Sequence, residues 1–339
     1  MQPKTKKIVI AALGVISLFL FNCAVYFYLK TIQASPKQNT NQKEPPKLFS
    51  PLTNREEPNL KIQSNPPGDY HILLLGTDQR TPKQQYYRTD AIMVVSILKN
   101  EKRVVLTSIP RDLWLSGTKI NAHYANEGFD KFKHRIGKVI GIEPDYFVSM
   151  GFDGFVWSVN QLGSINTNVE RSFIDPKYPP DRPNAPYPVS FETGTQNFSA
   201  EKALVYCRSR KGTNGEGNDF QRIRRQQNLL INVPQAFTNS DLVKLSAEAL
   251  YNLFSGHMQT NLGVGEIAEL LPIVKGWKNY KTEQIVLDTN NYLYEPPRDY
   301  YGGAYVLKPR GDSFETIHQV VLNKLTGDAS TASCNTCEN

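Results

Sequence analysis

The sequence lacks the short motifs that mark several large enzyme classes. Its 339 residues contain neither the Gly-x-Ser-x-Gly nucleophile elbow nor a Gly-Lys-Ser/Thr phosphate-binding loop. The five histidines show no metal-ligand spacing; they are His71, His123, His134, His257 and His318. These absences leave a serine hydrolase and a nucleotide-dependent enzyme without support in the sequence.

Cysteine is scarce, with four residues in the whole chain. Cys334 and Cys337 fall in a polar segment, 326–339, that we expect to be a flexible tail. A structural zinc site would need two more ligands nearby, so free thiols or a labile disulfide are expected there. Cys207 is expected to face the core, and Cys23 falls inside an apolar run.

Acidic residues are fewer than basic ones, 32 against 39, which gives a net charge of +7. This balance suits nucleic acid, an anionic membrane surface or an anionic substrate, and charge alone does not choose among them. With 40% apolar and 21% charged residues, the composition is that of an ordinary folded protein.

One long apolar run, residues 8–29, is interrupted only by Ser17 and Asn22. It is long enough to cross a hydrocarbon layer of ~30 Å as a single helix. Lysines precede it in residues 1–7, so the positive-inside rule places that short tail in the cytoplasm. A cleaved signal peptide is the alternative, but the run exceeds the usual length of about 7 to 15 residues. We expect a single-pass protein of the cell membrane whose remaining chain is extracytoplasmic, which disfavours a DNA-binding role.

Residues 30–67 contain seven prolines among Gln, Asn, Lys and Glu. This composition cannot form a packed core and predicts a disordered linker. As a coil, the linker would reach on the order of 35 Å. The domain that follows would therefore stay near the membrane surface, where a substrate anchored in the same bilayer is accessible.

From residue 68 onward, apolar runs alternate with helical periodicities, which indicates an α/β domain with ligands at the carboxyl ends of its strands. We expect strands at 72–75, 91–98, 104–109, 146–150, 165–169, 205–210 and 303–307, with a hairpin at 99–102. Helices are expected at 129–139, 153–162, 242–254, 262–274 and 314–325, and residues 175–188, with six prolines, are expected to form a surface loop.

Five arginines and two acids are concentrated in residues 206–227. On a strand, Arg208 and Arg210 would point to the same side. A helix beginning at Asp219 would place Asp219, Arg222 and Gln226 in one stripe, and the glycine-rich loop 211–218 would connect the two elements. Arginine forks suit phosphate oxygens, so a phosphate-bearing ligand is the first hypothesis and a solvated basic face is the alternative.

Other charged residues flank the first three predicted strands. Asp78 follows the first, Arg88 and Asp90 precede the second, and Arg111 follows the third. Two carboxylates beside arginines could hold a magnesium-bridged polyphosphate, with Asp78 and Asp90 as hard oxygen ligands. Each aspartate alone is more often a turn former or helix cap, so the joint pattern carries the hypothesis.

In their order along the chain, these motifs resemble the LytR-CpsA-Psr family of cell-envelope phosphotransferases. The matching segments are Gly76 to Arg80, Arg88 to Asp90, Pro110 to Asp112, Lys119 to Asn121, Tyr206 to Arg210, and Asp219 to Gln227. The resemblance implies a mixed central sheet flanked by helices, in an extracytoplasmic catalytic domain over residues 68–325 whose motifs lie within 70–235.

The resemblance also implies a reaction. Family members bind a glycan linked to polyprenyl pyrophosphate, with the lipid in an apolar tunnel, and transfer the phosphoglycan to a peptidoglycan hydroxyl with release of polyprenyl phosphate. Residues implied to bind the pyrophosphate are Arg88, Arg111, Arg208, Arg210, Arg222 and Gln226. Asp78 and Asp90 are implied to hold Mg²⁺, and Asp219 could orient an arginine or accept the proton of the acceptor hydroxyl.

Two other functions stay open. The protein could bind or regulate polyprenyl phosphates without turnover, although mere binding would need only the arginines and not the acid pair Asp78 and Asp90. It could also be a pyrophosphatase in which water replaces the sugar hydroxyl. Either function would use the same residues.

Overall fold

The computed structural model describes residues 62, 65, 68–79, 87–178 and 188–327, which belong to one compact unit, residues 57–339. The predicted anchor at 8–29, nearly all of the predicted linker at 30–67 and the tail with Cys334 and Cys337 lie outside the described residues. Within the described part, no helix combines the length and the apolar character needed to cross a membrane.

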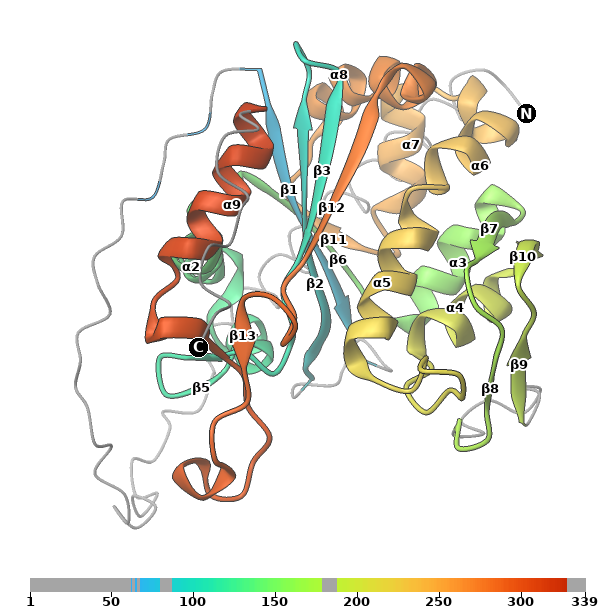
Figure 1. The fold of residues 1–339 in the computed structure, drawn as a ribbon. Coiled ribbons are helices and arrows are strands. Elements are labelled where there is room, and N and C mark those ends of the chain that lie inside the picture. Colours follow the sequence, from blue (N-terminus) through green and yellow to red (C-terminus); the bar gives the residue numbers. More distant parts are fainter. Residues whose placement is uncertain (1–61, 63–64, 66–67, 80–86, 179–187, 328–339) are drawn as a thin grey trace, which may run out of the picture. The chain divides into compact units, whose positions relative to one another are not determined.

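The predicted mixed central sheet is confirmed (Figure 1). Its six strands are ordered β11-β6-β1-β2-β3-β12. Their bounds are β1 Tyr70–Thr77, β2 Thr89–Leu98, β3 Arg103–Ser108, β6 Tyr146–Met150, β11 Gln259–Thr260 and β12 Lys281–Val286. The pairs β1·β6 and β3·β12 are parallel, whereas β1·β2, β2·β3 and β6·β11 are antiparallel. The ends of β1, β3, β6 and β12 therefore meet the start of β2 at one edge.

Helices α2 (His123–Ile140) and α9 (Glu315–Thr326) cover one face of the sheet (Figure 1). Their buried side chains recur at helical spacing and pack on inward-facing residues of β1, β2 and β3. Phe132, Ile136 and Leu73 are fully buried in this core. Gly141 ends α2 in the left-handed conformation.

The other face carries the remaining helices (Figure 1). They are α3 Phe152–Leu162, α4 Ala200–Arg208, α5 Asp219–Leu230, α6 Val233–Asn239, α7 Ala247–Phe254 and α8 Val264–Lys275. A second core lies beneath α4 and the small sheets β7·β10 and β8·β9, whose strands are β7 Ile165–Val169, β8 Phe173–Asp175, β9 Val189–Phe191 and β10 Gly194–Phe198. The other short strands are β4 Trp114–Leu115, β5 Thr118–Lys119, β13 Leu293–Tyr294 and β14 Lys308–Pro309.

The predicted strand at 205–210 is wrong, because residues 205–208 are the last turn of α4. Ser199 caps this helix, and no glycine or proline interrupts the chain before Ser209. Residues 203–207 are all buried, which differs from the alternation expected of a half-buried strand. The side chains of Arg208 and Arg210 therefore do not form a fork on one face of a strand.

Three predictions outside the motif segments also need correction. The expected strand at 303–307 is absent among the described elements, since Gly302 and Gly303 have positive φ angles and only Leu307 forms an isolated bridge, to Leu113. The expected helix at 242–254 is broken by extended residue Leu245 into a short 3-10 turn and α7. The expected surface loop 175–188 begins buried, since Asp175 and Tyr178 are 1% and 4% exposed.

Candidate active site

A cavity of about 1160 Å³ lies between the sheet and helices α3, α4 and α5. Apolar side chains from the middle of the strands and from the helices line most of it: Leu74, Met93, Val148, Met150, Phe155, Val159, Leu162, Leu204, Leu229, Leu230 and Val233. Charged lining residues come from the sheet edge, from the end of α4 and the loop after it, and from the start of α5; they include Asp78, Asp90, Arg111, Asp112, Arg208, Arg210, Asp219 and Arg222. The cavity is therefore apolar inside and charged at its mouth.

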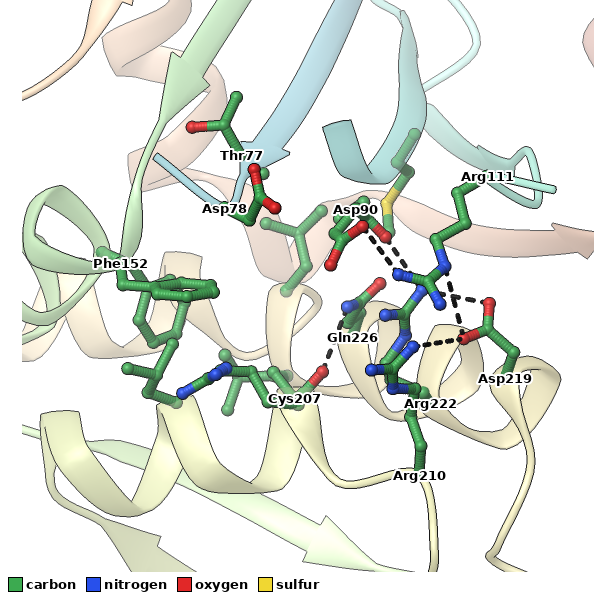
Figure 2. A pocket seen from close by; sticks show the side chains of 18 of the residues that line it. Thr77, Asp78, Asp90, Arg111, Phe152, Cys207, Arg210, Asp219, Arg222 and Gln226 are labelled. Carbon is green, nitrogen blue, oxygen red and sulfur yellow. Dashed lines mark hydrogen bonds and ion pairs between the residues drawn. The ribbon is translucent and has the colours of Figure 1, made fainter. Parts of the chain in front are cut away.

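Arginines and aspartates from four segments form one network at this mouth (Figure 2): the start of β2, the residues after β3, the loop after α4, and α5. Arg111 Nη1 donates to Asp90 Oδ1 at 2.7 Å, and Arg111 Nε lies 3.9 Å from Asp219 Oδ1. Arg222 Nη2 donates to Asp219 Oδ2 at 3.0 Å and to the Asp90 backbone carbonyl at 2.8 Å. Arg210 Nη1 lies 4.0 Å from Asp219 Oδ1. The sheet edge and α5 thus share a cluster of three guanidinium groups around two carboxylates.

Burial and neighbouring charges shift the pKa values of Arg222 and Arg111 in opposite directions. Arg222 is 3% exposed, and desolvation lowers the pKa of its guanidinium, with Arg111 nearby lowering it further and Asp219 opposing both. In Arg111, burial also disfavours the charge, but Asp90 and Asp219 outweigh it and raise the pKa. Among the described residues, Arg111 Nε, Arg222 Nε and Asp219 Oδ1 are buried and make no hydrogen bond. An anionic ligand with several oxygens would satisfy the two guanidinium N–H groups.

The N-terminus of α5 is held in place by local contacts. Asn218 caps the helix, its Oδ1 accepting the Gln221 backbone N–H at 2.9 Å. The Arg225 side chain is 4% exposed in this helix and donates to Glu216 Oε2 at 2.6 Å, to the Tyr206 carbonyl at 3.0 Å and to the Ser209 carbonyl. It therefore ties the end of α4 and the following loop to the helix that carries Arg222.

Asp175 holds the start of the loop between α4 and α5 through three hydrogen bonds. Its Oδ2 accepts the Ser209 hydroxyl at 2.6 Å and the backbone N–H groups of Arg210 and Lys211 at 3.2 and 3.1 Å. Burial alone would raise the pKa of this carboxyl, but these hydrogen bonds outweigh burial and lower it. The backbone of Arg210 is therefore fixed, whereas its side chain is 44% exposed.

Two predicted binding residues line other parts of the cavity. Gln226 donates from Nε2 to the Cys207 carbonyl at 3.1 Å, one turn along α5 from Arg222 (Figure 2). Arg208 packs on the Phe152 ring, 4.1 Å from guanidinium carbon to centroid, and donates to the Tyr178 hydroxyl at 3.1 Å. Phe152 lies across the cavity from Arg111 in Figure 2, so Arg208 lies apart from the central network. Cys207 is buried as predicted, and burial raises the pKa of its thiol to about 12.

Asp78 and Arg88 occupy the outer end of the β1·β2 pair. Asp78 Oδ1 accepts the Arg88 backbone N–H at 2.5 Å, and the Asp78 N–H donates to the Arg88 carbonyl at 3.0 Å. Asp78 lines the cavity, whereas the Arg88 side chain is exposed and is not among the lining residues. Pyrophosphate binding by Arg88 therefore stays a prediction.

The donor set at this edge is compatible with Mg²⁺. The described residues contain no group of three or more His, Cys, Asp or Glu side chains placed to hold a metal ion. Asp78 and Asp90 nevertheless both line the mouth and offer carboxylate oxygens, the ligands that Mg²⁺ prefers. Magnesium is commonly bound by one or two carboxylates together with substrate phosphates, so the two aspartates fit a site that the substrate completes.

Several residues of the site were not assigned a role from the sequence. Asp112 lies beside Arg111, 3.5 Å from its Nε, and accepts Lys119 Nζ at 2.5 Å. Tyr305 lines the cavity from a segment far along the chain that carries no recognisable motif. Asp112 and Lys119 belong to two of the family motifs, so the sequence could have predicted that they lie close together. Tyr305 offered none.

Known proteins resemble the chain in sequence. It is 29% identical over 273 residues to the Bacillus subtilis polyisoprenyl-teichoic acid–peptidoglycan teichoic acid transferase TagV. The aligned region covers 77% of this chain and 66% of TagV. It is 24% identical over 345 residues to the B. subtilis transferase TagT of the same description, covering 96% of each. It is also 29% identical over 203 residues to the Staphylococcus aureus regulatory protein MsrR, covering 58% of this chain and 57% of MsrR.

Solved structures agree with the fold. The crystal structure of B. subtilis TagV superposes with a TM-score of 0.58 at 26% identity and covers 76% of this chain and 97% of that one. The structure of TagT bound to LIIa-WTA superposes with a TM-score of 0.59 at 24% identity. The match covers 82% of this chain and 100% of the TagT chain. A family model described as the LytR_cpsA_psr family matches residues 25–320. With the motif order, the mixed sheet and the charged cavity in agreement, the chain belongs to the LytR_cpsA_psr family.

Proposed function

We propose that this protein transfers a phosphoglycan from a polyprenyl-pyrophosphate carrier to a hydroxyl of peptidoglycan and releases polyprenyl phosphate. One observation carries the proposal: a largely apolar cavity of about 1160 Å³ ends at a cluster of three arginines, of which Arg222 is buried. A lipid pyrophosphate has the same division into apolar and anionic parts. The full names of TagV and TagT, which describe polyisoprenyl-teichoic acid and peptidoglycan, support this substrate class.

The arrangement suits phosphoryl transfer, which depends on positioning and charge neutralisation more than on a covalent intermediate. The isoprenoid would lie along Leu74, Val148 and Leu229, and the pyrophosphate would contact Arg111 and Arg222. The acceptor oxygen bonds to the sugar-linked phosphorus as the bond from that phosphorus to the bridging oxygen breaks. The bridging oxygen and its electron pair leave with polyprenyl phosphate.

The acceptor hydroxyl must lose a proton in this step, and we assign the proton to Asp219. Asp219 lines the cavity, its side chain is 21% exposed, and its Oδ1 lies 3.9 and 4.0 Å from Arg111 and Arg210. Asp78 and Asp90 would hold Mg²⁺, which would neutralise phosphate charge when bound. Asp90 also accepts a hydrogen bond from Arg111, so the same carboxylate would order the arginine.

The proposal includes a place for the reaction. A helix at 8–29 would anchor the chain in the cell membrane with residues 1–7 in the cytoplasm, and the linker at 30–67 would keep the catalytic domain near the outer surface. Lipid-linked donor and peptidoglycan acceptor would both be available on that side.

The test measures release of polyprenyl phosphate from a lipid-linked pyrophosphate glycan by the full chain. We expect Arg111→Ala and Asp90→Ala each to lower release about 100-fold, the effect typical of losing a preorganised charge at a reacting group. Chelation of Mg²⁺ should have a similar effect. Arg171→Ala provides the control, since Arg171 is exposed and does not line the cavity. Unchanged release in both site variants would contradict the assigned site.

Product analysis separates the alternatives. A phosphodiester-linked glycan on added peptidoglycan supports transfer, whereas free phosphoglycan in equal amount with and without peptidoglycan supports a pyrophosphatase. Tight binding of the carrier with no product of either kind would support a binding or regulatory role, the class that the name of MsrR suggests.

A further inference from the structure

Four aromatic residues belong to two segments that backbone hydrogen bonds join beside Arg111. Trp114 belongs to β4, three residues after Arg111, and Tyr300, Tyr301 and Tyr305 belong to the segment between β13 and β14. The Trp114 and Tyr301 rings pack edge to face, with centroids 4.9 Å apart and planes at 72°. We call these four residues the aromatic rim.

Backbone hydrogen bonds fix the aromatic rim relative to the charged cluster. The Trp114 N–H donates to the Leu307 carbonyl at 2.8 Å, and the Leu307 N–H donates to the Asp112 carbonyl at 3.0 Å. Asp288 precedes β13, and its carbonyl accepts the Leu293 N–H of that strand at 3.0 Å. Asp288 is 1% exposed, and its Oδ2 accepts Arg224 of α5 at 2.6 Å. The rim is therefore tied both to the segment that carries Arg111 and to the helix that carries Arg222.

Tyr305 joins the rim to the cavity itself. It is one of the lining residues, and burial together with the nearby charges of Glu295, Asp112 and Asp219 raises the pKa of its hydroxyl. The Arg298 guanidinium carbon lies 5.4 Å from the Tyr305 ring centroid, and Arg298 Nε donates to Glu295 Oε1 at 2.9 Å. Charged hydrogen-bonding groups thus border the aromatic surface next to the reacting centre.

The outer end of the rim faces solvent. Tyr300 is 74% exposed, the largest value among the exposed large hydrophobic residues of the described chain. It stands in the short 3-10 helix Arg298–Tyr301, which ends at Gly302 in the left-handed conformation. In Figure 1 the segment after β13 projects beyond the sheet edge that carries the site. Nothing in the packing of the core requires a tyrosine there.

We propose that the aromatic rim binds sugar rings of the acceptor glycan and guides one hydroxyl to Asp219; this inference rests on the proposed function. Pyranose rings present C–H faces that pack on aromatic rings, and their hydroxyls would hydrogen-bond to Glu295, Arg298 and Asp299. The interior of the cavity is apolar and suits the lipid, so the acceptor must arrive from the solvent side of the mouth.

Charge distinguishes the acceptor from the donor glycan as the occupant. Lys177 and Lys211 line the cavity near Arg208 and Arg210, where an anionic glycopolymer would be favoured. The rim offers aromatic faces with both signs of charge, which suits the neutral sugars of a wall polymer. The rim also includes Tyr305, which is close enough to Asp219 for the charge of that carboxylate to act on its hydroxyl.

The test compares Tyr300→Ala with Tyr251→Ala in the full chain. Tyr251 is the matched control, because it is a partly exposed tyrosine, 37% accessible, on the remote helix α7. We expect Tyr300→Ala to raise the KM for soluble peptidoglycan strands at least fivefold and to weaken co-sedimentation with insoluble peptidoglycan to a similar extent. Tyr300→Trp should restore both values. The KM for the lipid donor, and donor cleavage by water, should stay within twofold.

Each other outcome is informative. An unchanged acceptor KM and unchanged sedimentation in Tyr300→Ala would overturn the inference while leaving the proposed function intact. A rise in donor KM without a rise in acceptor KM would also overturn it, since the rim would then bind the donor glycan. Sedimentation that depends on Tyr300 in a protein that transfers nothing would uphold the rim and contradict the proposed function.

Discussion

At the scale of single residues, α5 places two adjacent glutamines in opposite environments. Gln226 lines the cavity and makes one hydrogen bond, to a carbonyl of α4. Gln227 is 1% exposed and its Nε2 contacts Ser108 Oγ and the Leu106 and Ile285 carbonyls at 2.8 to 3.3 Å. One glutamine therefore attaches the helix to β3 and β12, and its neighbour faces the site.

This contrast predicts that the same substitution has different effects at positions 226 and 227. Gln227→Leu should lower the free energy of unfolding by about 3 kcal/mol, because buried polar groups lose their partner. Gln226→Leu should cost only about 1 kcal/mol but should slow release of polyprenyl phosphate. Urea denaturation and the release assay measure the two effects. Equal destabilisation by both variants would contradict the assignment of Gln227 as the structural residue.

The structure brings together four residues that the motifs singled out, although their roles stay predictions. Asp90, Arg111, Asp219 and Arg222 meet because their segments begin or end at the same edge of the sheet. Arg208 and Arg210 were expected to form a fork, but the chain leaves α4 between them, so they face different parts of the cavity. A two-residue spacing determines direction only after the secondary structure is known.

At the scale of elements, Arg225 holds the loop between α4 and α5. Removing its side chain would leave Glu216, which is 8% exposed, with a buried and unpaired charge. Arg225→Met should therefore lower the free energy of unfolding by about 3 to 5 kcal/mol. Adding Glu216→Leu should recover part of that loss, as a double-mutant cycle in urea would show. A double variant as unstable as the sum of the two single variants would argue against coupling.

Glu283 on β12 connects α9 to the sheet through Lys324 and Arg103. These partners, led by the Lys324 hydrogen bond, lower the pKa of its carboxyl from 4.5 to about 2. A carboxyl with a lowered pKa contributes stability above its unfolded pKa and loses it as the pH falls through the folded value.

The stability advantage of wild type over Glu283→Gln should therefore be present at pH 6 and shrink steadily between pH 4.5 and pH 2. Chemical denaturation at four or five pH values checks this. Asp241→Asn is the control, because its partner Lys244 is 76% exposed and solvent weakens that pair. A gap that widens on acidification would contradict the assigned cause.

Element types were predicted well where one period dominates. The strands at 91–98 and 146–150 and the helices at 153–162 and 314–325 are all confirmed to within about two residues at each end. The segment 303–307 was not, because an apolar run that follows two left-handed glycines is held by contacts to 112–114 that are distant in sequence. Local patterns carry no information about such long-range contacts.

At the scale of the whole molecule, the cavity keeps one side of the sheet from packing closely against the helices. Val148 of β6 lines it, while Val104 of β3 lies in the same sheet and does not. Val148→Phe should change the free energy of unfolding by less than about 1.5 kcal/mol, because the ring enters open space. It should slow turnover of a long-chain donor at least tenfold and affect a short-chain donor much less.

Val104→Phe is the matched control for this prediction and should leave both donors unaffected at equal folded fraction. Turnover of both donor lengths, measured side by side in the two variants, decides the matter. If Val148→Phe slowed short and long donors equally, the cavity would not be where the lipid lies.

A cavity with an apolar interior and a cationic entrance affects how fast the product leaves. In the proposed reaction the leaving group keeps its entire hydrocarbon chain, and as a phosphate monoester it carries nearly two negative charges at neutral pH. The features that capture the donor would hold the spent carrier with comparable strength. Its departure, rather than bond breaking, would then limit the rate, and added polyprenyl phosphate would compete with the donor for free enzyme.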